Sequence, residues 1–384
     1  MAPEPPPPPA APGTSASPVE THRFPCEACG ADLRFDPQAG QLVCDHCGHT
    51  EAMQMRDGGP AIRELDFRAA LERALPQAEM EETRVTTCTN CGAQVEFDPE
   101  LHALECPFCA TPVVADTGVH RHIKPRGVVP FALDERAARQ AMTLWLGGLW
   151  FAPGGLKEYA RKGRRMKGIY VPYWTFDADT ASRYTGERGT AYYETRTVMR
   201  DGKRVQQRVR KIRWAPASGR VARFFDDVLV LASRSLPKPF TDALEPWDLA
   251  ALEPYRPEFL AGFRAEGYQV ELAEGFEEAR ARMDMVIRRD VAFDIGGDAQ
   301  RIHAIQTELG DVTFKHILLP VWLAAYKYRG QTYRFVVNGQ TGRVQGERPW
   351  SVWKIAMAVL AGLLLAGILG FLVAQDPELL NQAF

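Results

Sequence analysis

Apolar residues recur at helical spacing in the middle of the chain. Ala138, Met142, Trp145 and Leu149 lie four, three and four positions apart, and Asp134 stands where a capping residue is expected. This pattern predicts an amphipathic helix that begins at that aspartate. The same reasoning predicts further helices over Asp66–Leu75, Asp248–Phe263 and Phe276–Ile287.

Aromatic and β-branched residues predict the strands. Ile169–Ala178 and Val221–Ala232 have this composition, and Pro172 confines the first to a sheet edge or to the start of a strand. Asp201-Gly202 lies between two further strand-like stretches, 192–198 and 205–214, which is a strong hairpin signal. We expect a second hairpin from Ile317–Tyr328 and Gln331–Val337. Residues 117–349 are thus predicted to form a central α+β domain.

The most apolar stretch is Ile355–Ala374, an uncharged run of 20 residues. At 1.5 Å per residue it is long enough to cross the roughly 30 Å hydrocarbon layer of a bilayer. Trp350 and Trp353 stand at its start, where interfacial aromatic residues belong. We therefore predict a transmembrane helix over 350–375, a short external tail over 376–384, and a lipid bilayer as a partner. The Lys/Arg bias predicts a single-pass inner-membrane protein with a cytoplasmic N-terminus.

Composition narrows the remaining choices. The chain has 384 residues and a net charge of −2, so it has room for two or three folded units and is not a polyanion binder by overall charge. Residues 1–22 are rich in proline, with a run from Pro5 to Pro9, and are predicted to be a disordered tail. They lack the basic start and apolar centre of a signal peptide.

All eight cysteines fall in one stretch and form the same pattern twice. Each copy reads C-x2-C-x14-C-x2-C, and every cysteine of the second copy lies 62 positions after its counterpart. A Phe-Asp-Pro sequence lies between the cysteine pairs of both copies, as expected for a hairpin with a proline-containing turn. The two sets are Cys26, Cys29, Cys44 and Cys47, then Cys88, Cys91, Cys106 and Cys109.

This spacing is typical of four-thiolate zinc ribbons. Two residues between cysteines allow a tight turn to direct both sulfurs at one metal ion, and a closed shell of four ligands leaves no position for water or substrate. We predict two structural zinc ions. Disulfides or a redox pair are weaker interpretations, because no export signal precedes the cysteines and a redox site does not need four CxxC motifs. His46 or His49 replacing a thiolate, and iron replacing zinc, remain open alternatives.

The predicted fold class is therefore α+β: two small β-hairpin zinc ribbons, a central α+β domain and one C-terminal transmembrane helix. The first ribbon is assigned to residues 23–50 and the second to 87–116. A helical linker over 51–86 is expected to fix them relative to each other. Each ribbon is too small for a large core, so the metal should supply most of its folding energy.

The central region shows no catalytic signature. Phosphate-binding, HExxH and GxSxG motifs are absent from the sequence, so we predict no enzymatic activity. His303 and His316 are interpreted as structural, and the pairs Asp177/Asp179 and Asp226/Asp227 as solvated strand edges. Two basic runs, within 157–167 and 200–213, are either solvated faces or contacts to phosphates of nucleic acid or lipid.

The chain resembles a family of bacterial membrane-anchored double zinc-ribbon proteins of undefined function. The resemblance is carried by the double ribbon, by 170–177 (YVPYWTFD), by 315–322 (KHILLPVW) and by 337–342 (VNGQTG). Members are often labelled transcription-factor-IIB-type zinc-ribbon or primosomal replication-factor-Y helicase-like. The resemblance implies association with Band-7-type membrane scaffolds or envelope-stress proteins. The helicase label has no support, because the phosphate-binding loop is missing.

These observations predict a membrane-anchored, cytoplasm-facing adaptor that binds protein partners and carries no catalytic site. The alternative is a membrane-tethered zinc-ribbon protein that binds nucleic acid, which the two basic runs favour. Mixed charge on the ribbons, with Glu27 and Asp45 in the first and Glu96 and Glu105 in the second, counts against that alternative.

Overall fold

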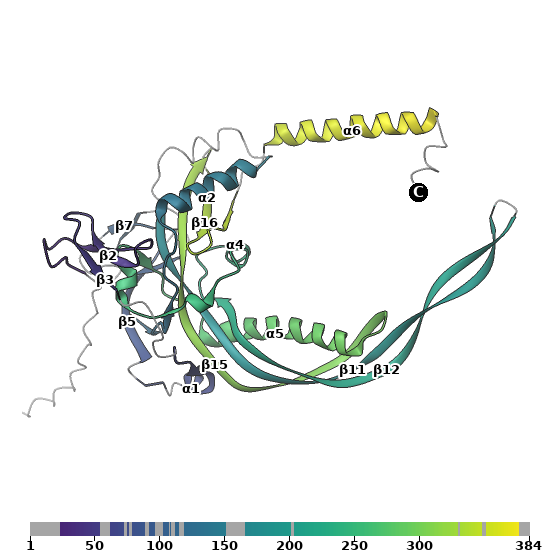
Figure 1. Ribbon diagram of the computed structural model, residues 1–384, viewed down its shortest axis with the longest axis horizontal. Coiled ribbons are helices and arrows are strands. Elements are labelled where there is room, and N and C mark those ends of the chain that lie inside the picture. The colour runs from purple at the N-terminus through teal and green to yellow at the C-terminus, as the bar shows by residue number, and fades with distance from the viewer. Residues whose placement is uncertain are drawn as a thin grey trace, which may run out of the picture.

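Three very long antiparallel strands organise the molecule in the computed structural model (Figure 1). They are β11 (Lys167–Arg200), β12 (Lys203–Leu231) and β15 (Ala299–Tyr328), with β11 between the other two. The structure describes the chain except for residues 1–23, 54–61, 73–74, 77–78, 89–91, 97–102, 107, 109–111, 115–118, 151–165, 201–202, 329–330, 348–350 and 376–384.

Shorter strands extend this sheet to nine and build smaller sheets beside it. The large sheet also contains β4 (Leu65–Asp66), β10 (Gly127–Val128), β13 (Glu253–Pro254), β14 (Arg264–Ala265), β16 (Gln331–Asn338) and β17 (Val344–Gly346). The smaller sheets consist of β1 (Leu33–Asp36), β2 (Gln41–Cys44) and β3 (Thr50–Ala52); β5 (Met80–Thr87), β6 (Gln94–Glu96) and β9 (Val119–Ile123); and β7 (Ala103–Glu105) with β8 (Pro112–Val114).

The helices lie around the sheet. Helix α5 (Leu272–Ile295) runs along the concave side of the three long strands (Figure 1), where Trp174, Phe176 and Phe276 form part of the buried core. The others are α1 (Phe67–Leu71), α2 (Glu135–Gly148), α4 (Lys238–Asp242), α6 (Val352–Gln375) and the 3-10 turns η2 (Leu249–Ala251) and η3 (Pro257–Leu260).

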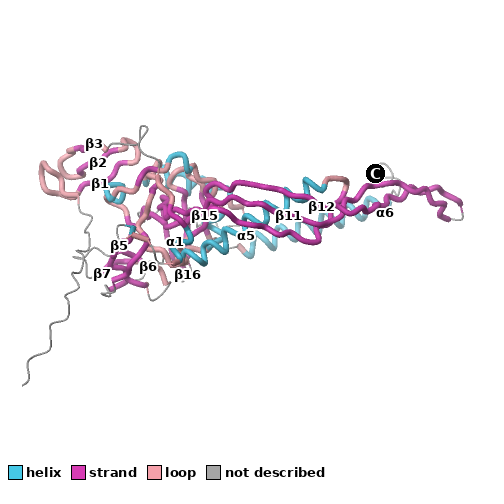
Figure 2. Tube along the Cα trace, turned by 90° about the horizontal axis from the view of Figure 1, so that it is seen from below, coloured by secondary structure: helices cyan, strands magenta, loops and turns pink. Residues whose placement is uncertain are grey.

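The two-stranded end of the sheet projects away from the core (Figures 1 and 2). Pairing between β11 and β15 begins at Gly189 opposite Ala299, so beyond that point β12 is the one strand that pairs with β11 among the described residues. The hairpin continues to Arg200 opposite Lys203, which confirms the predicted pairing of its two strands, whereas Asp201 and Gly202 themselves lie outside the described residues. The twist of these two strands around each other is visible in Figure 1.

The predicted α+β fold class is wrong, because the architecture is dominated by β-structure. The three long strands contain 34, 29 and 30 residues, whereas the longest helices contain 24. The predicted helix over Asp248–Phe263 is also wrong: this segment forms η2, the short strand β13 and η3. Pro254 and Pro257 explain the difference, since proline removes a helical hydrogen bond and its ring clashes with the preceding turn.

Other predicted elements are confirmed. Asp134 caps α2 by accepting a hydrogen bond from the backbone N–H of Ala137 at 2.7 Å. Ala138 and Met142 lie on the buried face of that helix. The prediction that Pro172 marks a sheet edge or the start of a strand is wrong, because this proline is the sixth residue of β11 and lies opposite Leu318 of β15.

The predicted membrane helix is contradicted. Helix α6 stands apart from the sheet (Figure 1) and exposes apolar residues such as Leu364, yet within the described part of the chain no helix is long and apolar enough to cross a membrane. The predicted single-pass inner-membrane localisation is contradicted by the same finding.

Candidate metal centre

The first cysteine set forms two matching turns at the ends of a hairpin. Strands β1 and β2 pair with Leu33 opposite Cys44, which brings the two CxxC segments together. In each turn a glycine N–H donates to the carbonyl of the first cysteine: Gly30 to Cys26 at 2.8 Å and Gly48 to Cys44 at 2.9 Å. Both glycines have φ near +75°, the left-handed conformation that favours this residue type.

These turns direct four sulfur atoms at one point. The Sγ atoms of Cys26 and Cys47 are 3.6 Å apart, those of Cys29 and Cys44 are 3.5 Å apart, and all four lie within 4.8 Å of one another. A tetrahedral zinc ion with Zn–S bonds of about 2.3 Å requires sulfur separations of about 3.8 Å. The set therefore fits zinc.

Within the described residues, the first ribbon is fixed to the rest of the protein through Phe35. Phe35 is buried and packs edge-on against Phe259 of η3, with ring centroids 5.5 Å apart, and its backbone N–H donates to Ala261 at 3.0 Å. Cys26 and Cys44 are buried on this side, whereas the turns of residues 27–30 and 45–48 are exposed. We call these two exposed turns the knuckles.

The second set repeats this backbone geometry where it is described. Gly92 donates to the carbonyl of Cys88 at 2.8 Å with φ near +72°, as Gly30 does in the first set. Cys88 and Cys106 are both buried in a core cluster that also contains Leu231 of β12. The other predicted ligands of this set, Cys91 and Cys109, lie outside the described residues.

The two histidines near the first set do not join its sulfur cluster. The group of ligand atoms within 4.8 Å consists of the four cysteines alone. His46 is exposed on a knuckle, and His49 instead lies with Glu27 and Glu51, its Nε2 3.7 Å from the Glu51 carboxylate. The described geometry thus favours four thiolates over a mixed ligand set.

A buried charge cluster, which sequence reasoning missed, lies where β4 joins β15. The Lys315 ammonium is 2.8 Å from carboxylate oxygens of Glu64 and Asp227 and 3.6 Å from Asp177. Burial and the hydrogen bond to Glu64 raise the pKa of Asp177. The interpretation of Asp177 as part of a solvated strand edge is wrong, because Asp177 is buried, and β-bulges lie beside it in the pairing with β12 and with β15. Lysine supplies the cation that these carboxylates need.

Glu266 is a second buried ionisable side chain. It is 2% exposed and accepts hydrogen bonds at Oε1 from Ser235 and, at 2.9 Å, from Ser233. Its Oε2 atom has no hydrogen-bond partner among the described residues. Burial raises the pKa of Glu266 to about 8, since a carboxylate loses its hydration there. No sequence pattern marks this residue, because a lone glutamate between strands has no distinctive spacing.

The two candidate histidines of the central region differ in burial. His316 is buried, with Nδ1 2.8 Å from the carbonyl oxygen of Ile123, whereas His303 is exposed on β15.

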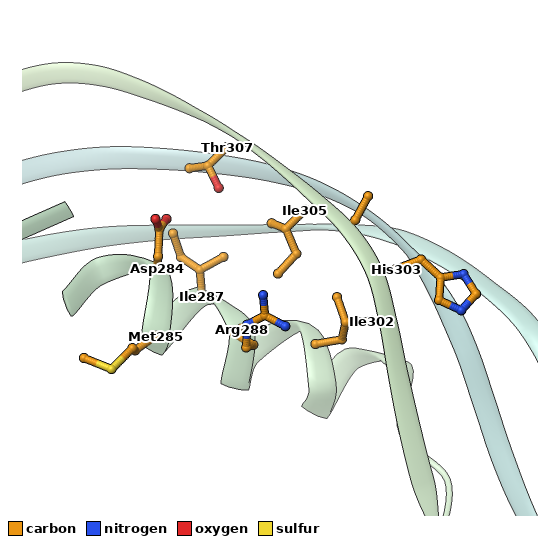
Figure 3. Close-up of a pocket in the computed structure, with 9 residues that line it drawn as sticks. Asp284, Met285, Ile287, Arg288, Ile302, His303, Ile305 and Thr307 are labelled. Atoms are coloured by element: carbon orange, nitrogen blue, oxygen red, sulfur yellow. The ribbon is translucent and has the colours of Figure 1, made fainter. Parts of the chain in front are cut away.

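A cavity of about 280 Å³ lies between α5 and β15, with Ile287 and Arg288 on the helix and Ile305 on the strand (Figure 3). Its lining residues do not form a nucleophile with an adjacent base. The basic run within 157–167 lies largely outside the described residues.

Comparisons with known proteins agree with the sulfur geometry. Residues 20–52 match the family model for the zinc-finger of RNA-polymerase I-specific TFIIB, Rrn7. The chain therefore contains a zinc ribbon within residues 20–52. The chain is also 25% identical over 336 residues to the uncharacterized protein YdjG of Bacillus subtilis (strain 168), which covers 87% of this chain and 92% of that protein. No solved structure matches.

Proposed function

We propose that this chain is a non-catalytic zinc protein that binds a protein partner through the knuckles of its first ribbon. The supporting observation is the one-sided burial of that ribbon. Cys26 and Cys44 face the core, and Cys29 and Cys47 lie on the exposed side. A surface held this way is rigid and correctly oriented before a partner arrives, which lowers the entropic cost of binding.

We also propose that both ribbons hold zinc in a structural role. Four thiolates complete the metal shell, so neither ion has an open coordination position for a reacting group. The repeated backbone of Cys88 and Gly92 supports a second ion. The partners that the family resemblance implies, Band-7-type scaffolds and envelope-stress proteins, are the first candidates to examine.

The test separates the knuckle surface from the metal. Full-length protein is crosslinked in cells and purified, either wild type or with Glu27→Lys and His46→Asp, two exposed changes on the knuckles that leave all eight cysteines intact. The expected result is loss of a stoichiometric protein partner with unchanged zinc content. Glu277→Lys, an exposed change on α5, is the matched control and should retain the partner. Equal recovery from all three proteins refutes the proposal.

A further inference from the structure

The projecting hairpin consists of two strands with no third strand beside them among the described residues. Beyond Gly189 opposite Ala299, eleven residue pairs of β11 and β12 follow, from Thr190 opposite Arg213 to Arg200 opposite Lys203. We call residues 190–213 the arm. At about 3.4 Å per residue the arm is about 37 Å long. Isolated two-stranded hairpins are only marginally stable in water, so a ribbon this long gains stability from whatever it binds.

The arm is strongly basic. It contains eight lysine and arginine residues against two acidic ones, Glu194 and Asp201, although the whole chain has a net charge of −2. One of the acidic residues is neutralised internally, since Lys211 forms an ion pair with Glu194. The cationic character of the arm is therefore a local property and not a consequence of overall composition.

The basic residues point to both faces of the ribbon. Residues directly opposite each other share a face, and the faces alternate along each strand. Arg196 and Arg213 lie on one face, and Arg204, Arg208 and Arg210 lie on the other. All five side chains are exposed. A flat anionic surface, such as a lipid bilayer, would contact one face and leave the other charges without partners.

Aromatic side chains hold some of these arginines. The guanidinium of Arg208 lies 4.8 Å from the ring centroid of Tyr193, and that of Arg213 lies 5.3 Å from Tyr192. Stacking on an aromatic ring restricts the guanidinium while leaving its N–H groups free to donate to phosphate oxygens. This arrangement favours a role in binding phosphates over a role as a solvated surface that only repels other molecules.

From these observations we infer that the arm binds double-stranded DNA. The major groove of B-form DNA is about 12 Å wide and admits a two-stranded β-ribbon, whose two faces then meet the phosphates on the two walls. One helical turn of about 34 Å is close to the length of the arm. This inference uses neither the zinc ribbons nor the proposed protein partner. Its test is therefore independent of the proposed function.

The test uses full-length protein and a fluorescent 24-base-pair DNA duplex, with anisotropy measured from 50 to 200 mM salt. Five phosphate contacts give a slope of about −4.5 in log K against log salt, which corresponds to about a 500-fold loss of affinity over this range. Replacing Arg204, Arg208 and Arg210 by alanine should reduce the slope by about 2.7 and weaken binding at least tenfold at 100 mM salt.

Two further proteins make the result decisive. The control replaces Arg136, Arg280 and Arg289, three exposed arginines on helices, and should bind as the wild type does. A shortened hairpin, with 191–212 replaced by Asn-Gly, removes the arm while retaining the Thr190–Arg213 pair and should lose the DNA. Circular dichroism and thermal melting verify that both proteins fold.

The outcomes are unambiguous. A DNA affinity that falls for the arm variants and not for the control supports the inference. Equal losses in the two triple variants would overturn it, as would tighter binding to an RNA duplex, to phosphatidylserine vesicles or to polyglutamate than to DNA. The RNA comparison is informative because the major groove of A-form RNA is too deep and narrow for a ribbon.

Discussion

Replacing the buried Glu266 by glutamine should stabilise the protein, and increasingly so as the pH rises. Burial raises the pKa of Glu266 from 4.5 to about 8, so the folded state holds a proton that the unfolded state releases above pH 4.5. The folded state then binds more protons than the unfolded one, and the free energy of unfolding falls with rising pH between these two values. Glutamine has the same shape and carries no charge at any of these pH values.

The magnitude follows from the two pKa values. Each pH unit between them costs about 1.4 kcal/mol, so at pH 7 the wild type bears a penalty of up to about 3 kcal/mol that the variant lacks. We expect the stability difference between Glu266→Gln and wild type to grow by about 2 kcal/mol from pH 6 to pH 8 and then to level off, because the slope halves at the folded pKa.

The assay is urea unfolding of zinc-loaded protein at half-unit steps from pH 6 to pH 8.5. Glu277→Gln on the exposed side of α5 serves as the control, with a difference of less than about 0.5 kcal/mol expected at every pH. A Glu266→Gln difference that stays constant with pH would refute the reasoning, since it would show that the carboxyl group is already ionised in the folded protein.

Three further substitutions test the packing described above. Phe35→Ala should cost about 3–5 kcal/mol and free the first ribbon from the core, which hydrogen exchange would detect as lost protection of that ribbon. Gly186→Ala should cost about 1–3 kcal/mol in thermal unfolding, because an added Cβ would collide with the backbone oxygen of Arg301. Lys315→Met should cost about 3–5 kcal/mol in urea unfolding, because it leaves the buried Asp177 without its cation.

Each of these has a matched control. Phe293 is 89% exposed, so Phe293→Ala should leave stability nearly unchanged. A Cβ at Gly310 would meet only ordinary contacts, so Gly310→Ala within the same sheet tests whether any glycine change is harmful. Lys238, whose side chain is 45% exposed, provides the comparison for the buried lysine. A variant that matches its control would contradict the corresponding packing argument.

The sequence predicted those features that rest on local chemistry. The cysteine spacing identified the sulfur cluster, and Asp134 marked the start of α2, because ligand turns and helix caps need particular residues at fixed separations. The length of β11 and β12 could not be predicted. Between residues 188 and 199 exposed residues such as Thr190 and Thr195 occur on both faces of the hairpin, so the alternation that marks a half-buried strand disappears.

The buried charge cluster could not be predicted from the sequence for a related reason. Lys315 and Glu64 are 251 positions apart in the chain and meet only because β4 pairs with β15. No local pattern encodes such a meeting. The buried Asp177, read alone, has the composition of a solvated strand edge, and only the tertiary structure shows its cation.

Strand β12 has β11 on one side and, within the described residues, no strand on the other along its 29 residues. An open edge of this length is a template for pairing with another molecule, and proteins commonly guard such edges with positive charge and proline. Here Arg204, Arg220 and Pro216 supply both. Charge repulsion between molecules weakens as the Debye length shrinks to about 3 Å in 1 M salt. We therefore expect the protein to stay monomeric in dilute buffer and to pair with a second copy edge to edge through β12 in concentrated salt, which light scattering would reveal.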